Sequence, residues 1–457
     1  MGKECEAGNA ANAGGVANAG NAANAGGVGN AANVANAADA AGVAAGLDAL
    51  AGMSNEYGRQ ARYVLAGGGN TSFKTEAELY VKASGTSLAT VRAGDFVGLS
   101  RAKLDAIMEK PYDRADEAKR EAEVLSDMMA ARLAGSEGKR PSVETLLHNI
   151  FPERYVLHLH PALVNGLTCG AGGEEAARRL MPAPYVWIPA YRPGYELALL
   201  CRDRLGAYER ERGERPKVIL LQNHGIFVSG DAPQEIGATL GGVMGALDGA
   251  AAARPACRPP EAEAAGAGVK AGAKVGAGTG AGVDAAHVAG ADPAPAVAAD
   301  PAAAAAMRLL AGIFPPPAAV RFSAGADILR LLESERSFFP LSGPFTPDHI
   351  VYCKPSFLYI GELGGEEGLR ERIGLFEREH GYAPRVICVR GVGAFFAGAS
   401  ETEAANAQLL FGDAADIAVY SQNFGGPSHM PRELADFILG WEIESYRQKV
   451  AAGGGAG

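Results

Sequence analysis

The stretch RYVLHLHP, residues 154–161, decides the fold of the region around it. Large apolar residues alternate with two histidines, a pattern typical of a β-strand that is buried on at least one face. Successive side chains of a strand point to opposite faces, so His158 and His160 share one face while Leu157 and Leu159 share the other. The stretch therefore predicts a strand that presents two imidazoles side by side.

Segments with the same apolar character lie on either side of this strand. LYVKAS (79–84) and KVILLQ (217–222) indicate further strands. PSVETLLHNIF (141–151) and DAPQEIGATLGGVMGAL (231–247) indicate helices, the second with a proline in its first turn. Because strands and helices are interspersed along the chain, the sequence predicts a mixed α/β protein.

The composition divides the 457 residues into four parts. Residues 7–46 consist of Ala, Asn, Gly and Val, broken only by Asp39. Because few large apolar side chains offset the chain entropy, we expect residues 1–47 to form a disordered tail. Residues 249–306 are dominated by Ala, Gly and Pro, which favours a flexible linker. Two structured blocks remain: a larger one at 48–248 and a smaller α/β block at 307–450.

The smaller block carries a stretch that resembles part of the larger one. Aligning residues 217–231 with 385–399 matches a strand, a glycine turn and a phenylalanine, and both copies lead into an alanine-rich helix. This favours a degenerate internal repeat, although any buried strand followed by a glycine turn and a helix produces a similar pattern. His224 aligns with Val392, so the second copy lacks the histidine at this position.

Charge and cysteine usage exclude several classes of function. The net charge is −10 and no basic stripe occurs, so we expect no nucleic-acid partner. The six cysteines are scattered without a C-x-x-C pair, which favours reduced cytoplasmic thiols. The sequence shows neither a signal-peptide core nor a run of about 18 apolar residues, so we expect a cytoplasmic protein without a membrane partner.

Three of the eight histidines suit a metal site. His158 and His160 aim at one point, and His224 ends an apolar strand just before Gly225, where the chain must turn. Zinc and similar metals bind imidazole nitrogens at roughly 2.0–2.1 Å and need ligands that converge in this way. An H-x-H pair alone is often accidental, but the N-H-G turn strengthens the prediction of a metal site.

Glu144 and two glycine-rich segments complete the candidate site. Glu144 lies in the first turn of the helix expected at 141–151, where the helix dipole favours an ionised carboxylate. His148 follows four residues later on the same face, where it either orients the carboxylate or serves packing, and packing is slightly favoured. Residues 67–74 and 82–88 combine glycines, small hydroxyls and a lysine each, which suits a phosphate cradle but also an ordinary turn.

Five motifs in a fixed order resemble the class II aldolase/adducin family, which includes L-fuculose-phosphate and L-rhamnulose-phosphate aldolases and pentulose-phosphate 4-epimerases. The motifs are G-N-T-S (69–72), A-S-G-T (83–86), P-S-V-E (141–144), H-L-H-P (158–161) and Q-N-H-G (222–225). The resemblance spans roughly residues 55–248. It implies a three-layer α/β fold, in which helices flank a mixed β-sheet, and it implies a homo-oligomer.

The resemblance also implies roles for individual residues. His158, His160 and His224 would bind Zn²⁺ or another divalent cation, and Glu144 would exchange protons with the substrate. A family tyrosine is matched loosely by Tyr191. The substrate phosphate would contact Asn70, Ser84, Gly85 and Ser142, with Thr71 or Ser72 assisting. One departure is Val143, which stands where sugar-phosphate aldolases of this family tend to have a second serine, and it weakens the expectation of a phosphorylated substrate.

The implied function is a zinc-dependent aldehyde-lyase that cleaves a ketose 1-phosphate into dihydroxyacetone phosphate and an aldehyde through a metal-stabilised enediolate. A 4-epimerase with the same metal site and a non-catalytic adducin-like interaction protein are the alternatives. In the second block, residues 347–360 and 389–400 are similar to segments of the long rhamnulose-phosphate aldolase/dehydrogenase proteins. No G-x-G-x-x-G fingerprint follows a strand, so we expect no dehydrogenase domain in this sequence.

Overall fold

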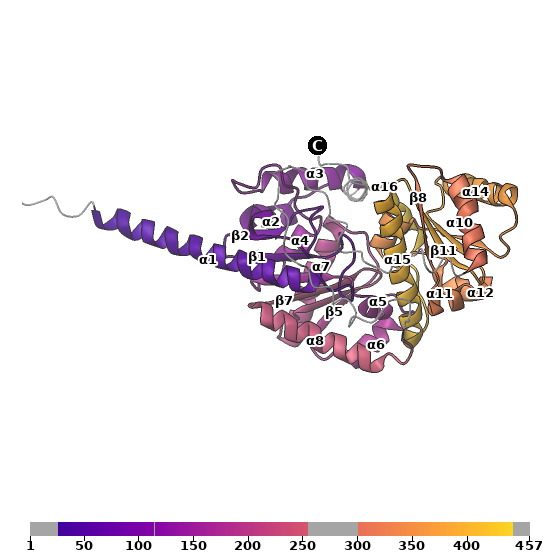
Figure 1. Cartoon of the computed structure of the whole chain (residues 1–457). Helices are drawn as coiled ribbons and strands as arrows, with labels where there is room; N and C mark the ends of the chain where they lie inside the picture. The colour runs from indigo at the N-terminus through magenta and orange to yellow at the C-terminus, as the bar shows by residue number, and fades with distance from the viewer. Residues whose placement is uncertain (1–25, 114, 255–299, 442–457) are drawn as a thin grey trace, which may run out of the picture. The chain divides into compact units, whose positions relative to one another are not determined.

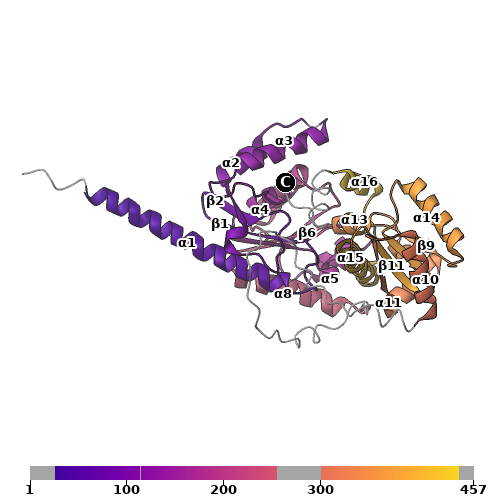
Figure 2. The same cartoon turned by 45° about the horizontal axis from the view of Figure 1, so that its top comes forward.

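A computed structural model of the chain describes residues 26–113, 115–254 and 300–441. The chain divides into two compact units, Met1–Gly46 and Leu47–Gly457. Helix α1 (Gly26–Gly58) begins in the first unit and ends in the second. The strands and the other helices of the described ranges belong to the second unit, which contains two β-sheets (Figures 1 and 2).

The larger sheet is built from the strands β1 (Asn70–Lys74), β2 (Glu78–Lys82), β3 (Phe96–Ser100), β4 (Tyr155–Leu159), β5 (Tyr185–Ile188), β6 (Val218–Leu221) and β7 (Gly225–Gly230). Their spatial order is β3-β2-β1-β4-β7-β6-β5, which places β4 at the centre. Only the β5–β6 pair is parallel among these seven strands, so the sheet is mixed, as predicted. The segments predicted as strands form β2, β4 and β6.

Helices cover both faces of this sheet. They are η1 (Ala93–Asp95), α2 (Arg101–Glu109), α3 (Glu117–Ala130), α4 (Thr145–Asn149), α5 (Ala162–Thr168), α6 (Gly173–Leu180), α7 (Tyr195–Arg212) and α8 (Pro233–Ala250). The end of α1 packs with α5, α6 and α8 on the face that carries Leu157 and Leu159. Helices α2, α3, α4 and α7 pack on the face that carries Val156 and Phe227. The result is the predicted three-layer α/β arrangement.

The smaller sheet consists of β8 (Ala319–Ser323), β9 (Leu358–Ile360), β10 (Val386–Val389) and β11 (Gly393–Gly398). The accompanying helices are α10 (Pro301–Ile313), α11 (Ala326–Leu331), α12 (Glu335–Phe338), η4 (Phe339–Leu341), α13 (Pro347–Cys353), α14 (Glu366–His380), α15 (Glu401–Tyr420), η5 (Ser421–Phe424) and α16 (Arg432–Gly440). Helices α10 and α14 pack on one face, and α11, α12, α13 and α15 on the other. This is the second α/β block that the sequence predicts.

The two blocks share a tightly packed boundary at α5 and α15 (Figure 2). A Cβ atom on Gly166 would lie only 2.4 Å from the Cβ atom of Tyr420, so the two helices meet at a position where no side chain fits. Beyond α15 the chain continues along the first block. There the Gly172 N–H donates to the Phe424 carbonyl at 2.8 Å, and the Ser428 N–H donates to the Cys169 carbonyl at 2.7 Å.

Four strands of the larger sheet have the same order as the four strands of the smaller one. The order β4-β7-β6-β5 parallels β8-β11-β10-β9, and corresponding pairs run in the same relative directions. This is the arrangement that the proposed repeat requires. The strand registers pair His158 with Phe227 and Phe322 with Phe395, so Phe322 occupies the place of His158 in the smaller sheet.

The expected tail (1–47) and the expected linker (249–306) both contain helical residues. Residues 26–47, expected to be disordered, form part of helix α1, because alanine has the highest intrinsic helix propensity and a helix satisfies its own backbone hydrogen bonds. The expected linker at 249–306 begins and ends in helices: α8 extends to Ala250, and α10 begins at Pro301. Residues 1–25 and 255–299 lie outside the described residues.

Two further expectations concern cysteines and membranes. Cys169, Cys201, Cys353 and Cys388 are buried free thiols, whereas Cys5 and Cys257 lie outside the described residues. Among the helices of the described ranges, none combines the length and the apolar character that a bilayer crossing requires.

Candidate metal centre

Strand β4 carries two of the predicted histidines to one side of the sheet. His158 is fully buried, its ring stacks on Phe227 with 4.0 Å between centroids, and its Nδ1–H donates to the Ile226 carbonyl at 3.0 Å. His160 lies just past the end of the strand, and its Nδ1–H donates to a carboxylate oxygen of Asp348 at 2.6 Å. Both rings therefore use Nδ1 as the donor, which leaves both Nε2 atoms as acceptors.

The third histidine is placed by the turn between β6 and β7. Asn223 adopts a left-handed conformation with φ of 57°, which asparagine tolerates better than most residues. A side chain on Gly225 would lie 2.4 Å from the Leu159 carbonyl and 2.8 Å from the His160 ring, so only glycine lets β7 approach the end of β4 here. The Asn-His-Gly sequence thus turns the chain and brings His224 beside the other two histidines.

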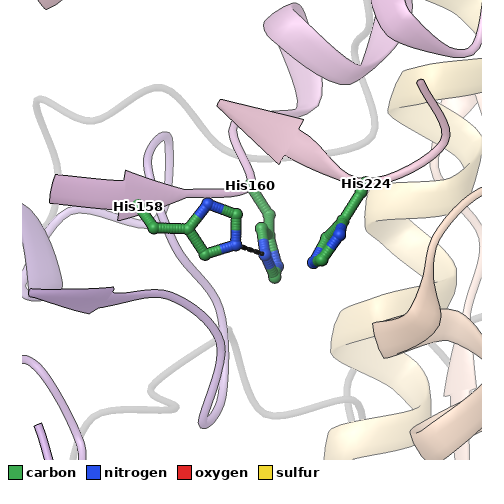
Figure 3. A group of neighbouring side chains, drawn as sticks. All are labelled: His158, His160 and His224. Atoms are coloured by element: carbon green, nitrogen blue, oxygen red, sulfur yellow. Dashed lines mark hydrogen bonds between the residues drawn. The ribbon is translucent and has the colours of Figure 1, made fainter. Parts of the chain in front are cut away.

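The three imidazoles converge on one point (Figure 3). One nitrogen from each ring lies within 4.8 Å of the others, and the Nε2 atoms of His158 and His160 are 2.8 Å apart. Burial lowers the pKa of His224 to about 3, although the Glu144 carboxylate opposes the shift and the other two histidines add to it. His224 is consequently neutral at pH 7, the state in which imidazole binds metals.

Glu144 adds a carboxylate to this cluster. Its Oε1 atom lies 3.3 Å from the His158 Nε2 and 3.4 Å from the His224 Nε2. This buried oxygen has no hydrogen-bond partner among the described residues. Three electron-rich ring nitrogens and an unsatisfied anionic oxygen facing one another are the donor set that a divalent cation satisfies, so the residues fit a metal ion.

A chain of polar contacts holds the other oxygen of Glu144. The Asn70 amide Nδ2 donates to Oε2 at 2.6 Å and also to the Ser142 hydroxyl at 3.2 Å. His148 binds the Asn70 amide oxygen through Nε2 and the Ser72 hydroxyl through Nδ1 at 2.7 Å. His148 thus holds Asn70, which in turn holds Glu144, and its fully buried ring also packs edge-on against Phe227.

A pocket opens beside these residues, and most of the predicted site lines it. The pocket-lining residues from the sequence-based prediction are Asn70, Ser84, Gly85, Ser142, Glu144, His160 and His224. Val143 and Lys82 also line the pocket, and the buried Lys82 ammonium group donates to the Thr86 carbonyl at 2.7 Å. The structure thus gathers residues from separate motifs around one opening.

Two neighbours of the site point elsewhere. Thr71, expected at the substrate phosphate, does not line the pocket: successive side chains of β1 alternate between faces, and its hydroxyl contacts the Ser54 hydroxyl of α1 at 2.7 Å. Lys74 is also buried away from the pocket, with its Nζ donating to the Phe151 carbonyl at 2.7 Å. Burial, reinforced by Arg101, lowers its pKa to about 7.

Tyr191 lies in a second hollow next to the pocket. This hollow shares His224, Pro193 and Pro347 with the first and is otherwise lined largely by apolar residues, including Met430. The Tyr191 side chain is 43% exposed there. The structure therefore brings Tyr191 to the neighbourhood of His224 but not into the pocket with Glu144.

Sequence reasoning missed the contribution of the second block. Asp348 and Pro347 come from α13, and 188 positions separate Asp348 from its partner His160. No local pattern in PDHIVYC marks an aspartate that reaches a histidine in another block. Only the packing of the two blocks brings them together.

The fold and the site together define an α/β protein with a three-histidine candidate metal centre at the end of its central strand. Residues 48–239 match the family model of the Class II Aldolase and Adducin N-terminal domain. The match covers this part of the chain, and the C-terminal block lies outside it.

Relatives share this region at modest identity. An uncharacterized oxidoreductase, YuxG, of Bacillus subtilis (strain 168) is 31% identical over 190 residues, which are 40% of this chain and 26% of that protein. The match thus spans about a quarter of the length of that relative. Solved structures that are similar include the N-terminal class II aldolase domain of a conserved Thermoplasma acidophilum protein (24% identity, 44% of this chain, 92% of that chain, TM-score 0.38). Another is L-fuculose-1-phosphate aldolase from Thermus thermophilus (17% identity, 46% and 93%, TM-score 0.30).

Proposed function

We propose that the protein is a divalent-metal-dependent aldolase that cleaves a ketose 1-phosphate of the rhamnulose or fuculose type into dihydroxyacetone phosphate and an aldehyde. The observation that carries this proposal is the unsatisfied Oε1 atom of Glu144, which faces the nitrogens of His158 and His224 beside an open pocket. Buried polar atoms are almost always hydrogen-bonded, so an exception calls for a function. A protein that only binds a partner would have no function for this carboxylate oxygen.

His158, His160 and His224 would hold the cation, with zinc as the first candidate. When bound, such a cation acts as a Lewis acid that polarises a substrate carbonyl. Glu144 would move the proton at the carbon next to that carbonyl: its carboxylate takes the proton when the C–C bond forms and returns it when the bond breaks. Asn70 keeps the Glu144 carboxylate in one orientation, so the Oε1 atom stays directed toward His158 and His224.

Other residues that line the pocket would receive the phosphate. Ser84 and Gly85 line it at a turn in which Gly85 has a positive φ of 83°. Ser142 also lines the pocket, and its hydroxyl accepts the Glu144 N–H at 3.3 Å. Lys82 adds an ammonium group to the lining. Hydroxyl groups, backbone N–H groups and a cation are the usual partners of a phosphate in proteins.

Metal analysis combined with a cleavage screen tests the proposal. Zinc- or cobalt-loaded protein is incubated with rhamnulose 1-phosphate, fuculose 1-phosphate and other ketose 1-phosphates, and dihydroxyacetone phosphate is measured with a coupled glycerol-phosphate dehydrogenase. We expect one metal ion per chain and release of dihydroxyacetone phosphate from at least one sugar. Metal-loaded protein that cleaves none of them contradicts the proposal, whereas stereochemical interconversion without any released ketone identifies an epimerase.

Two neighbouring residues of β1 should differ sharply in their effect on turnover. Asn70→Ala removes the hydrogen bond that holds the Glu144 carboxylate. Because misplacing a catalytic group by about 1 Å lowers the rate on the order of a hundredfold, kcat should fall by that factor. The bound metal should be retained. Thr71→Val removes a buried hydrogen bond on the other face and should cost about 1 kcal/mol of stability without changing kcat. Steady-state kinetics and thermal unfolding of both variants check the difference, which equal losses of kcat would contradict.

A further inference from the structure

The second block contributes a carboxylate to the candidate metal centre. Asp348 is the second residue of α13, its side chain is only 6% exposed, and its Oδ2 atom accepts the Nδ1–H of His160 at 2.6 Å. Pro347, the preceding residue, lines the pocket that contains Glu144. Helix α13 therefore contacts both the candidate metal ligands and the space for the substrate.

The first block leaves room for this carboxylate. A Cβ atom on Gly68 would lie 2.9 Å from the Asp348 Oδ2 atom and 3.4 Å from the His160 Nδ1 atom, so any larger residue would disturb the contact between Asp348 and His160. Its neighbour Gly67 donates its backbone N–H to the Tyr352 hydroxyl, one turn further along α13, at 3.4 Å. The loop before β1 is thus shaped around α13.

The rest of the second block fixes α13 in place. His349, next to Asp348, is fully buried, and its Nε2 pairs with the Asp413 carboxylate of α15 at 3.1 Å. The other ring nitrogen of His349 accepts the Phe345 N–H at 3.3 Å. Ile350 packs on the apolar face of α16. These contacts tie α13 to α15, to α16 and to the segment before it, so Asp348 is carried by a helix that is packed into the second block.

We propose that the second block completes the metal centre, with Asp348 as the positioning residue of His160. Its carboxylate accepts the Nδ1–H of His160, which fixes the tautomer whose Nε2 faces His158 and makes that nitrogen a better metal ligand. The proposal rests on the proposed function, because it takes the three histidines as the metal ligands. The Nδ1–H of His158 is held by a backbone carbonyl instead, so Asp348 supplies a charged acceptor to one ligand of the set.

The test measures metal binding by the full-length chain, without substrate. Zinc affinity is obtained by competition with a chromophoric chelator, and the geometry of the ligand set is monitored by the visible absorption of the Co²⁺-loaded protein. We expect Asp348→Ala to bind zinc about 10- to 100-fold more weakly than the wild type and to change the Co²⁺ spectrum. Asp348→Asn, which keeps a neutral acceptor, should give a smaller loss.

Asp413→Asn provides the matched control. Asp413 is as buried as Asp348, lies in the same block and pairs with a histidine, but that histidine, His349, is not among the candidate ligands. The amide that replaces the carboxylate keeps an acceptor for the Nε2–H of His349, so α13 should stay in place. We expect this variant to lose some stability yet to keep the zinc affinity and the Co²⁺ spectrum of the wild type. A merely structural role of Asp348 would make the two variants alike.

Each outcome bears on the proposal. Unchanged zinc affinity and Co²⁺ spectrum in Asp348→Ala overturn the role of Asp348 but leave the proposed function standing. A wild-type chain that binds neither zinc nor Co²⁺ overturns the proposed function itself. If Asp348→Ala does not fold, the Gly68→Ala variant is measured instead. Its added methyl group should displace the Asp348 carboxylate and weaken zinc binding. Unchanged zinc affinity in this variant rejects the proposal.

Discussion

A chain with phenylalanine in place of His158 is expected to bind no stoichiometric divalent metal and to lose turnover by a factor on the order of a thousand or more. The phenyl ring preserves the volume of the side chain and its stacking on Phe227, while it removes both ring nitrogens. A Lewis-acid cation contributes several kcal/mol of charge stabilisation in the transition state, and about 1.4 kcal/mol corresponds to a tenfold change in rate. Metal analysis after gel filtration and steady-state kinetics measure the two losses.

His380→Phe is the control for that variant. His380 ends α14 in the second block and contacts the rings of Phe376 and Tyr382, so the same substitution is made far from the candidate ligands. This variant should keep its metal and its turnover. Full activity of the His158→Phe protein without bound metal would contradict the metal centre as described.

Glu144→Gln is expected to lower kcat by about a hundredfold to ten-thousandfold while the metal stays bound, because general acid–base catalysis contributes factors of this size. The substitution keeps the shape of the side chain and an oxygen that accepts the Asn70 hydrogen bond, but it removes the carboxylate that we propose exchanges the proton. The three histidines are unchanged. Kinetics over a range of pH, together with metal analysis, separate a lost proton-transfer group from a lost cation.

A buried glutamate outside the site provides the comparison. Glu153 lies at the far end of β4 and accepts a hydrogen bond from the Ser229 hydroxyl at 2.9 Å. Glu153→Gln should change stability and leave kcat unaltered. If Glu144→Gln turned over substrate at the wild-type rate with metal bound, another group would have to move the proton.

The candidate ligands were accessible to sequence reasoning because strand geometry is local. The period of two places His158 and His160 together, and the Asn-His-Gly turn after an apolar strand indicates where a third ligand emerges. The same alternation of side chains places Asn70 and Thr71 on opposite faces of their strand. Both residues belong to the G-N-T-S motif, but the strand directs the Thr71 side chain to the opposite face, where its hydroxyl contacts Ser54.

Features that depend on distant packing were not accessible. The contact between Asp348 and His160 joins two blocks, and no periodicity or spacing in either segment indicates it. The role of His148 depends on Asn70, which belongs to another motif. The composition did not indicate helix α1 for a different reason. A segment with few large apolar residues cannot build a core, but its alanines still favour a helix by their intrinsic propensity.

Backbone hydrogen bonds join the two blocks. The part of the chain that matches the family model is therefore shorter than the part that we expect to unfold as one unit. Residues 48–239 match the family model, yet the N–H groups of Ala171 and Gly172 donate to the carbonyls of Gly426 and Phe424 in the second block. A fragment that ended after α8 would leave these donors and the inter-block surface of α5 without their native cover. A family match that is limited to one block therefore does not imply that this block is stable alone. We expect the two blocks to unfold together in a single transition.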